Sequence, residues 1–279
     1  YTDDQRTETL SCYDDNCPIE TPNIDRLATE GIRFNQGFVV SPICGVSRAC
    51  LLSGQYMSHH QVKRFQKPLP EESFAQSYPA QLSNAGYYLG LFGKHGFGIT
   101  KEQEDCFDFY HATTSQGPAF RIYKGDTLHD AAWLTQMTHD FLDSVPGDQP
   151  FCIQLNYKEP HPTSVPAPED DGKLADYPFT RVITDTPEEH AKLPKFVQTG
   201  YGNRSYNTMF GNDEKMQTYV SHYYEKIMSV ERSIGEIAKM LEEKKLDKNT
   251  VIIYLSDHGT HFGEKQLGAK WSPYEQSLR

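Results

Sequence analysis

Short apolar runs separated by polar loops and helix-like stretches constrain the fold of this chain more than any other feature. The clearest runs are Tyr87–Phe92, Pro150–Tyr157 and Thr250–Leu255. Runs of this length predict strands that are buried on both faces, and helical periodicity between them predicts crossover helices. We therefore predict an α/β fold with a mainly parallel, mixed sheet sandwiched between helices.

Helix signals lie between these runs. In segment 21–31, Thr21 is the predicted N-cap, Pro22 the first helical residue and Gly31 the stop signal. Apolar spacing predicts further helices over residues 79–85, 127–145 and 213–245. Residues 163–212 are rich in Pro, Asp, Gly, Thr and Asn and lack clear periodicity, so we predict a long insertion near the functional site.

Composition excludes some classes of function. With 38 acidic and 27 basic residues, the formal charge of −11 argues against nucleic acid as a partner. An acidic protein that binds an anion needs local cations. No apolar run reaches membrane-spanning length, and no secretory signal is present. The six cysteines (12, 17, 44, 50, 106 and 152) match neither a dense disulfide framework nor paired zinc spacing. They therefore do not indicate whether the protein belongs to an oxidising or a reducing compartment.

A cysteine-centred segment follows Ile32–Val40, which we predict to be another strand. Residues 41–54 open an apolar helical stretch, which places Cys44 near helix N-terminal N–H groups that favour a developing negative charge. Arg48 lies one helical turn further on and can face the same point. For this segment alone, a half-buried structural cysteine is the alternative interpretation.

Ionisable residues follow the other predicted strands. They are Asp3 and Asp4 after a strand stub at the N-terminus, Lys94 and His95, His161, and Asp257 with His258. Because ligands bind beyond the carboxyl ends of parallel strands, these side chains are expected at one edge of the sheet. Carboxylate oxygens are the ligands that Ca²⁺ or Mg²⁺ requires, whereas a solvated acidic terminus is the alternative for an isolated Asp-Asp pair.

Several motifs resemble those of the type I sulfatases, a family with the alkaline-phosphatase-like fold. Cys-Gly-Val-Ser-Arg from Cys44, followed by Leu-Leu-Ser-Gly, resembles the family's Cys-x-Pro-Ser-Arg and Leu-Thr-Gly, with Val46 in place of proline. Gly96 stands where the family histidine is usual. The remaining matches are Thr-Pro-Asn-Ile-Asp-Arg-Leu-Ala at 21–28, Gly-Lys-His at 93–95, Pro-His-Pro at 160–162, Ser-Asp-His-Gly at 256–259, Gly-Ala-Lys at 268–270 and Tyr-Glu-Gln-Ser-Leu-Arg at 274–279.

The resemblance covers almost the whole chain. It implies a sulfatase catalytic domain over residues 1–279 that is shortened at both ends and lacks the smaller C-terminal subdomain. It also implies a sulfuric ester hydrolase acting on a sulfated compound, with a sulfated carbohydrate as the expected substrate. A periplasmic or secreted location follows from the same resemblance.

Two cofactors are implied by the resemblance. In the family, the cysteine is oxidised after translation to formylglycine, whose hydrate is the nucleophile, so a formylglycine-generating enzyme is an expected partner. One divalent cation is also implied, Ca²⁺ first and Mg²⁺ second. Its implied ligands are Asp3, Asp4, position 44, Asp257 and His258.

The resemblance also implies roles in catalysis. Arg48 would act with the cation to activate the nucleophile. Lys94 and Lys270 would neutralise the sulfate oxygens. His161 would protonate the leaving alcohol, and His95 would accept the proton when the aldehyde is regenerated.

Two other functions stay open from the sequence. One is a phosphate or phosphonate monoesterase of the same fold, although a paired-zinc phosphatase needs more His and Asp ligands than can be placed. The other is a non-catalytic binder of sulfated glycans in which Cys44 stays a thiol. Val46 and Gly96, which depart from the family pattern, favour the binder.

Overall fold

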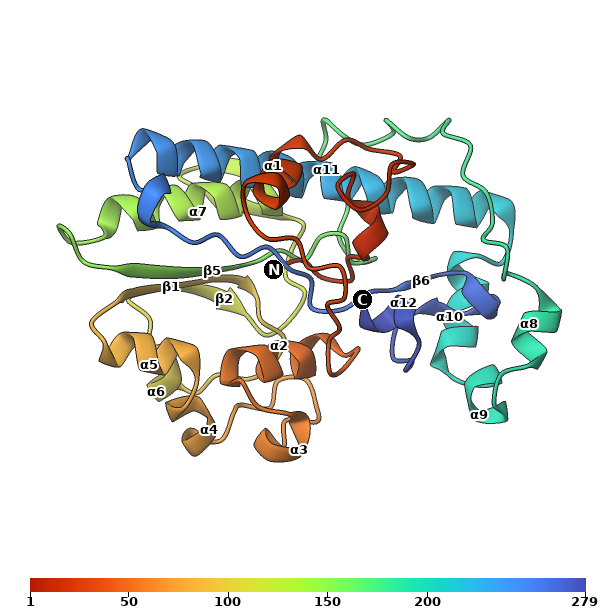
Figure 1. The fold of residues 1–279 in the computed structure, drawn as a ribbon, viewed down its shortest axis with the longest axis horizontal. Coiled ribbons are helices and arrows are strands. Elements are labelled where there is room, and N and C mark those ends of the chain that lie inside the picture. Colours follow the sequence, from red (N-terminus) through yellow and green to blue (C-terminus); the bar gives the residue numbers. More distant parts are fainter. The chain divides into compact units, whose positions relative to one another are not determined.

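The computed structural model describes residues 1–279, which form two compact units. Segments of the two units alternate along the chain, and their elements are labelled in Figure 1. The first unit contains Tyr1–Thr2, Cys44–Lys158 and Arg232–Leu255, and the second contains Asp3–Ile43, Glu159–Glu231 and Ser256–Arg279. The long helix α11 (Asp213–Glu243) has residues in both.

A three-stranded parallel sheet lies at the centre of the first unit. Strand β1 (Tyr88–Lys94) lies between β2 (Phe109–Thr113) and β5 (Phe151–Asn156). The register pairs Gly90 of β1 with Phe109 on one side and with Ile153 on the other. From Leu89 onward β1 is buried, as the continuous apolar run predicts for a middle strand.

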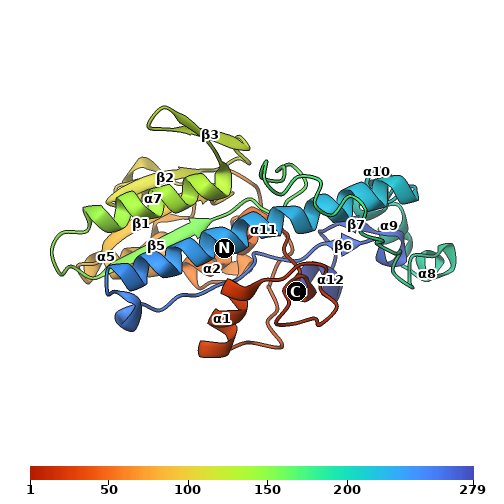
Figure 2. The same cartoon turned by 90° about the horizontal axis from the view of Figure 1, so that it is seen from above.

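Helices pack on both faces of this sheet. Figure 1 shows α7 (Asp130–Ser144) above the strands and α2 (Cys44–Ser53) with α5 (Tyr78–Asn84) below them. The part of α11 that belongs to the first unit lies beside α7 in Figure 2, and Thr135 and Ser233 share a hydrogen bond of 2.6 Å there. The layers are held by apolar packing, for example of Ala49 and Leu52 in one cluster with Leu89 and Leu91.

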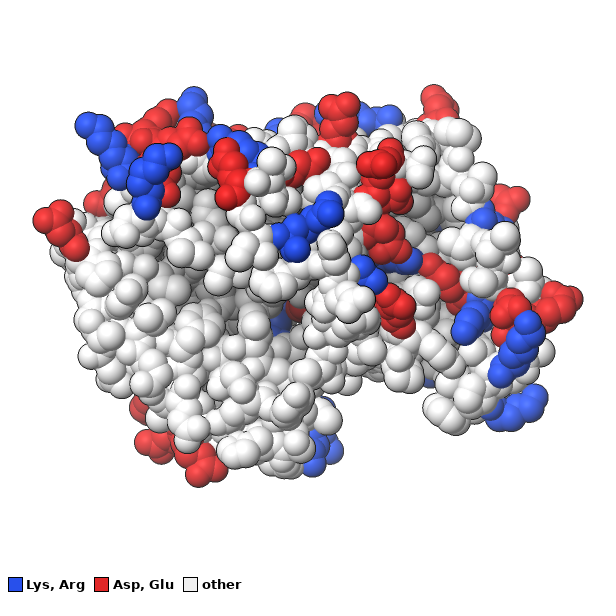
Figure 3. Space-filling model, viewed as in Figure 1, with Lys and Arg blue, Asp and Glu red and all other residues white.

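Short elements complete the first unit. They are α3 (Met57–His60), α4 (Glu71–Ala75), α6 (Lys101–Glu104), the hairpin β3 (Phe120–Tyr123) with β4 (Asp126–His129), and η2 (Asp247–Asn249). Because residues 126–129 pair with β3, the helix predicted over 127–145 begins only at Asp130. On the face seen in Figure 3, the part of this unit over β1, β2 and α5 shows almost no charged side chains.

The second unit is built from helices, loops and one small antiparallel pair of strands. Besides part of α11, its elements are η1 (Thr7–Thr9), α1 (Pro22–Glu30), α8 (Pro187–Ala191), α9 (Lys195–Gln198), α10 (Tyr201–Met209), β6 (His261–Phe262), η3 (Glu264–Gln266), β7 (Gly268–Ala269) and α12 (Glu275–Leu278). Residues 163–212, which lack clear apolar periodicity, contain the short helices α8, α9 and α10. No helix of the chain combines the length and apolar character needed to cross a lipid bilayer.

Two predicted strands are wrong. Neither Ile32–Val40 nor Thr250–Leu255 forms a strand, and Val251 and Ile253 are 85% and 73% exposed. An apolar run predicts burial, but a strand also requires a neighbour that pairs with its N–H and C=O groups. At the N-terminus, the strand stub consists of Thr2, whose N–H donates to Leu255 O within the first unit, and of a single bridge between Asp3 and Pro160 in the second.

Helix α1 begins where predicted, but Thr21 does not cap it. The Thr21 side chain makes no capping hydrogen bond and instead donates to Asp25 Oδ1 at 2.8 Å. The carboxylate of Glu231 accepts from Asn23 N–H at 2.6 Å and from Ile24 N–H at 3.1 Å. A carboxylate from a distant helix therefore satisfies the free N–H groups of the first turn, a partner that local sequence does not indicate.

Candidate functional site

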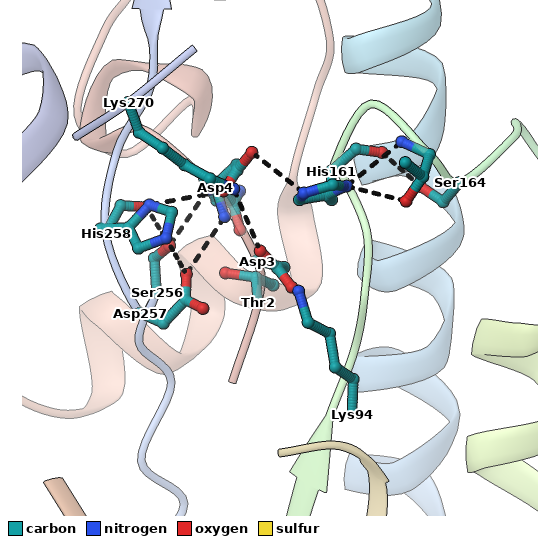
Figure 4. Close-up of polar contacts among 12 residues, drawn as sticks. Thr2, Asp3, Asp4, Lys94, His161, Ser164, Ser256, Asp257, His258 and Lys270 are labelled. Carbon is teal, nitrogen blue, oxygen red and sulfur yellow. Dashed lines mark hydrogen bonds and ion pairs between the residues drawn. The ribbon is translucent and has the colours of Figure 1, made fainter. Parts of the chain in front are cut away.

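Asp3, Asp4, Asp257 and His258 form a buried cluster in the second unit (Figure 4). Asp4 N–H donates to Asp257 Oδ1 at 3.2 Å. His258 Nδ1 lies 3.4 Å from Asp4 Oδ1, and His258 Nε2 lies 3.6 Å from Asp257 Oδ1. The structure thus brings together four predicted metal ligands that come from opposite ends of the chain.

Backbone contacts fix the N-terminal residues of this cluster. Asp3 N–H donates to Glu159 O at 3.0 Å, and Gln5 N–H donates to Ser256 Oγ at 3.0 Å. In an extended strand, consecutive side chains point to opposite faces. Asp4 has a φ of 69°, in the left-handed region, which breaks that alternation. This turn allows both neighbouring carboxylates to reach one cluster.

Lys270 and His161 border the same carboxylates. Lys270 Nζ bonds to Asp4 Oδ1 and lies 3.9 Å from Asp3 Oδ1. His161 Nε2 lies 3.9 Å from Asp4 Oδ2, and its Nδ1 accepts from Thr163 N–H at 3.2 Å. Because Nδ1 accepts a hydrogen bond, the neutral imidazole carries its proton on Nε2, on the side of Asp4.

Burial and the neighbouring charges shift the pKa of Asp4. Burial raises the pKa of the Asp4 carboxyl, and its neighbours Asp3 and Asp257 add to that effect, whereas Lys270 and His258 oppose it. Lys270 bonds directly to Asp4, and a cation would further offset the negative charge that these three buried carboxylates carry together.

The donor set fits a divalent cation. Ligand atoms of Asp3, Asp257 and His258 lie within 4.8 Å of one another, and so do those of Asp3, Asp4 and His161. Carboxylate oxygens dominate both groups, which favours a hard ion such as Ca²⁺. The residues present in the second unit are therefore suited to one divalent ion.

Sequence analysis missed Lys226, which lies beside this cluster. The side chain comes from α11, is buried, and donates to His161 O at 3.1 Å. Burial lowers the pKa of Lys226 to about 8, and the nearby Glu159 and Asp4 carboxylates oppose that shift. A signal was present, because Lys226 interrupts the buried stripe of α11 that includes Tyr223 and Val230.

The first unit holds Cys44 and Arg48. Cys44 is the first residue of α2 and is 2% exposed. Arg48 is fully buried, and its guanidinium bonds to Lys94 O at the end of β1. It also lies 3.4 Å from Asn156 Oδ1 and 3.3 Å from Thr2 O. These acceptors fix the guanidinium at the carboxyl ends of β1 and β5.

Lys94 is the last residue of strand β1 in the same unit, and His95 follows it. Both are buried, and His95 N–H donates to Thr113 O at 3.0 Å. His95 Nε2 lies 3.2 Å from Tyr110 Oη. Burial, together with the Arg48 charge, lowers the pKa of His95 to about 4, so this imidazole is neutral at neutral pH.

A family model described as Sulfatase matches residues 1–279. This chain belongs to the sulfatase family. It is 28% identical to an N-acetylglucosamine-6-O-sulfatase from Bacteroides thetaiotaomicron, and the match covers 100% of the chain and 60% of that relative's length. The predicted family is thereby confirmed, while the chain spans less than two thirds of this sulfatase.

Solved structures confirm the predicted alkaline-phosphatase-like α/β fold. BT4656 in complex with its substrate D-glucosamine-2-N,6-O-disulfate is similar with a TM-score of 0.77 and 25% identity, over 99% of this chain and 67% of that one. A phosphonate monoester hydrolase from Silicibacter pomeroyi gives a TM-score of 0.76 at 21% identity, over 99% and 65% of the two chains. The second likeness concerns the fold alone.

Gly96, where sulfatases usually have histidine, meets a local requirement of the backbone. Its φ is 81°, a conformation that side chains rarely adopt. A Cβ atom added to Gly45 would lie 2.5 Å from Gly96 O, so this loop passes directly against the first turn of α2. In this sulfatase-family chain, the departure at Gly96 is therefore matched by close backbone packing beside Cys44.

Proposed function

We propose that this protein hydrolyses a sulfate ester, with a sulfated carbohydrate as substrate. The observation that carries the proposal is the buried cluster of Asp3, Asp4, Asp257 and His258, bordered by Lys270 and His161. Membership of the sulfatase family supports it. The names of two similar proteins, an N-acetylglucosamine-6-O-sulfatase and one bound to D-glucosamine-2-N,6-O-disulfate, support a sugar sulfate.

Two cofactors belong to the proposal. Asp3, Asp4, Asp257 and His258 would hold one divalent cation, Ca²⁺ before Mg²⁺, with position 44 as a further ligand. Bound there, the cation would stabilise negative charge on the reacting groups. Cys44, matured to formylglycine by a separate enzyme, would supply the nucleophilic hydroxyl.

The remaining roles follow from the chemistry of each side chain. Lys94 and Lys270 would bind the sulfate oxygens, and Arg48, fixed by its carbonyl partners, would hold positive charge near the nucleophile. His161 would donate its Nε2 proton to the leaving alcohol. His95 is neutral at neutral pH and would accept the proton in the last step.

Three further assignments complete the proposal. Residues 1–279 would form a sulfatase catalytic domain. Residues 163–212, which directly follow the His161 loop, would contribute to substrate selection. A periplasmic or secreted location is proposed from the family resemblance.

The test uses protein made with its maturation enzyme. The mass of the peptide that contains position 44 should show formylglycine, and an aryl sulfate should be hydrolysed faster than the matching aryl phosphate or phosphonate. Cys44→Ala should remove hydrolysis while the protein stays folded. Unmodified cysteine together with binding of sulfated glycans would instead support the binder. Faster cleavage of the phosphate or phosphonate would support the monoesterase.

A further inference from the structure

A second group of potential metal ligands lies in the second unit. Asp171, His222 and Glu225 each offer a ligand atom, and these three atoms lie within 4.8 Å of one another. His222 and Glu225 are three residues apart on α11 and therefore share one face of the helix. Asp171 comes from the turn that follows Ala167, and its Oδ1 lies 3.9 Å from His222 Nε2.

Glu225 distinguishes this group from an ordinary cluster of surface acids. Its side chain is 0% exposed. One oxygen, Oε1, accepts from Leu174 N–H at 2.8 Å, whereas the other, Oε2, is buried without a hydrogen-bond partner. A buried carboxylate oxygen without a partner costs free energy, and a bound cation would satisfy it.

The ligand types indicate the class of ion. One imidazole and two carboxylates are a donor set typical of Zn²⁺ and similar transition metals, whereas Ca²⁺ takes oxygen ligands. Helix-borne carboxylate and imidazole ligands three residues apart also recur in metal-binding bundles. Asp171 and His222 have 63% and 47% exposed side chains, so both are free to adjust, and water can complete the coordination.

We propose that Asp171, His222 and Glu225 bind one Zn²⁺-class ion, separate from the cation of the sulfatase cluster. The ion would fasten the 167–177 turn to α11. That turn already contacts the helix through Leu174, and through Gln217 Nε2, which donates to Ala175 O at 3.1 Å and to Tyr177 O at 2.7 Å. The proposal concerns binding only and does not depend on hydrolysis.

The test measures bound metal in the whole protein. With excess Ca²⁺ present to occupy the hard-ion site, equilibrium dialysis against Zn²⁺ should give one more equivalent for the wild type than for His222→Ala. Glu225→Gln keeps an acceptor for Leu174 N–H and should also weaken Zn²⁺ binding at least about tenfold. Titration with Co²⁺ should show ligand-field bands that are lost in His222→Ala while any sulfur-to-metal band is unchanged, because no thiolate belongs to the site.

A matched control is available on another helix. His139 Nδ1 lies 3.1 Å from Asp143 Oδ2, and this exposed pair has no buried third carboxylate. His139→Ala should leave the extra equivalent in place. Equal Zn²⁺ binding by the wild type and His222→Ala, an equal loss in His139→Ala, or a Co²⁺ thiolate band that disappears in His222→Ala would each overturn the assignment.

Discussion

At the scale of single residues, a charge contributes to the stability of the fold when its partner of opposite charge is buried with it. Arg6 Nη1 donates to Glu264 Oε1 at 2.7 Å in the second unit. Burial alone would raise the pKa of Glu264, but His261 and Arg6 outweigh it and lower that pKa from 4.5 to about 2. The ionised carboxylate is therefore more favourable in the folded chain than in the unfolded one.

The Arg6–Glu264 pair predicts that the stability of the fold decreases at acidic pH. Because the folded pKa of Glu264 is lowered, its contribution to stability is fully present above pH 4.5 and is lost as the pH falls toward about 2. The contribution is about 3 kcal/mol. Glu264→Gln should lower the free energy of unfolding at pH 7 and remove that pH dependence, as measured by denaturant unfolding at several pH values. A variant that retains the full pH dependence would contradict the assignment to Glu264.

Replacing Lys270 should affect cation binding and sulfate-ester hydrolysis in opposite directions. Its ammonium bonds to Asp4 and lies near Asp3, so it competes electrostatically with a cation on the same carboxylates. Lys270→Met should therefore bind Ca²⁺ about tenfold more tightly while losing sulfate-ester hydrolysis. Calorimetric titration and an aryl sulfate assay would measure the two effects. Lys215→Met, which removes an exposed lysine from α11, should change neither.

At the scale of elements, apolar runs predicted strands correctly only where a partner strand lay alongside. Tyr88–Lys94 and Phe151–Asn156 pair with each other, and both were predicted. Residues 250–255 are also apolar but form no strand, because apolar character carries no information about pairing. The helices predicted over 213–245 and 79–85 are present as α11 and α5, whereas the capping partner of α1 was not predictable from neighbouring residues.

The N-terminus of α1 can be tested directly. Glu231→Gln leaves one acceptor oxygen where two now accept from Asn23 and Ile24 N–H, and the unpaired donor should lower the free energy of unfolding by about 1 kcal/mol. Glu236→Gln is the matched control, because Glu236 is an exposed glutamate on α11, the helix that contains Glu231. Denaturant unfolding would compare the two variants. Equal effects would mean that the two hydrogen bonds to Glu231 do not stabilise α1.

At the scale of the whole molecule, family motifs predicted the candidate site better than strand patterns did. Asp257 and Asp4 meet although the strand expected before Asp257 is absent. Lys226 and Glu225 were missed for a common reason, since a charged residue inside a long helix is ordinarily a solvated one. The position of Lys226 in the apolar stripe of α11 indicated its burial, but the partners of both residues lie far along the chain, and a local pattern does not identify them.

The cation should stabilise the folded chain as a whole. Its proposed ligands come from residues 3–4 and 257–258, so binding ties together segments that separate on unfolding. Saturating Ca²⁺, at about 100 times its dissociation constant, should raise the unfolding free energy by about 2.7 kcal/mol. Thermal melts of chelator-treated protein with and without Ca²⁺ would measure this. Asp257→Asn should lose the shift, and an undiminished shift in that variant would place the ion elsewhere.

The left-handed backbone at Asp4 has a consequence for redesign of the site. Glutamate would preserve the charge there, but its side chain is poorly tolerated at a positive φ. Glycine would suit the backbone but remove the oxygen ligands. Asparagine accepts the conformation and keeps one carbonyl oxygen. Aspartate and asparagine both suit the backbone at this position, so replacing one with the other would vary the charge while leaving the bend intact.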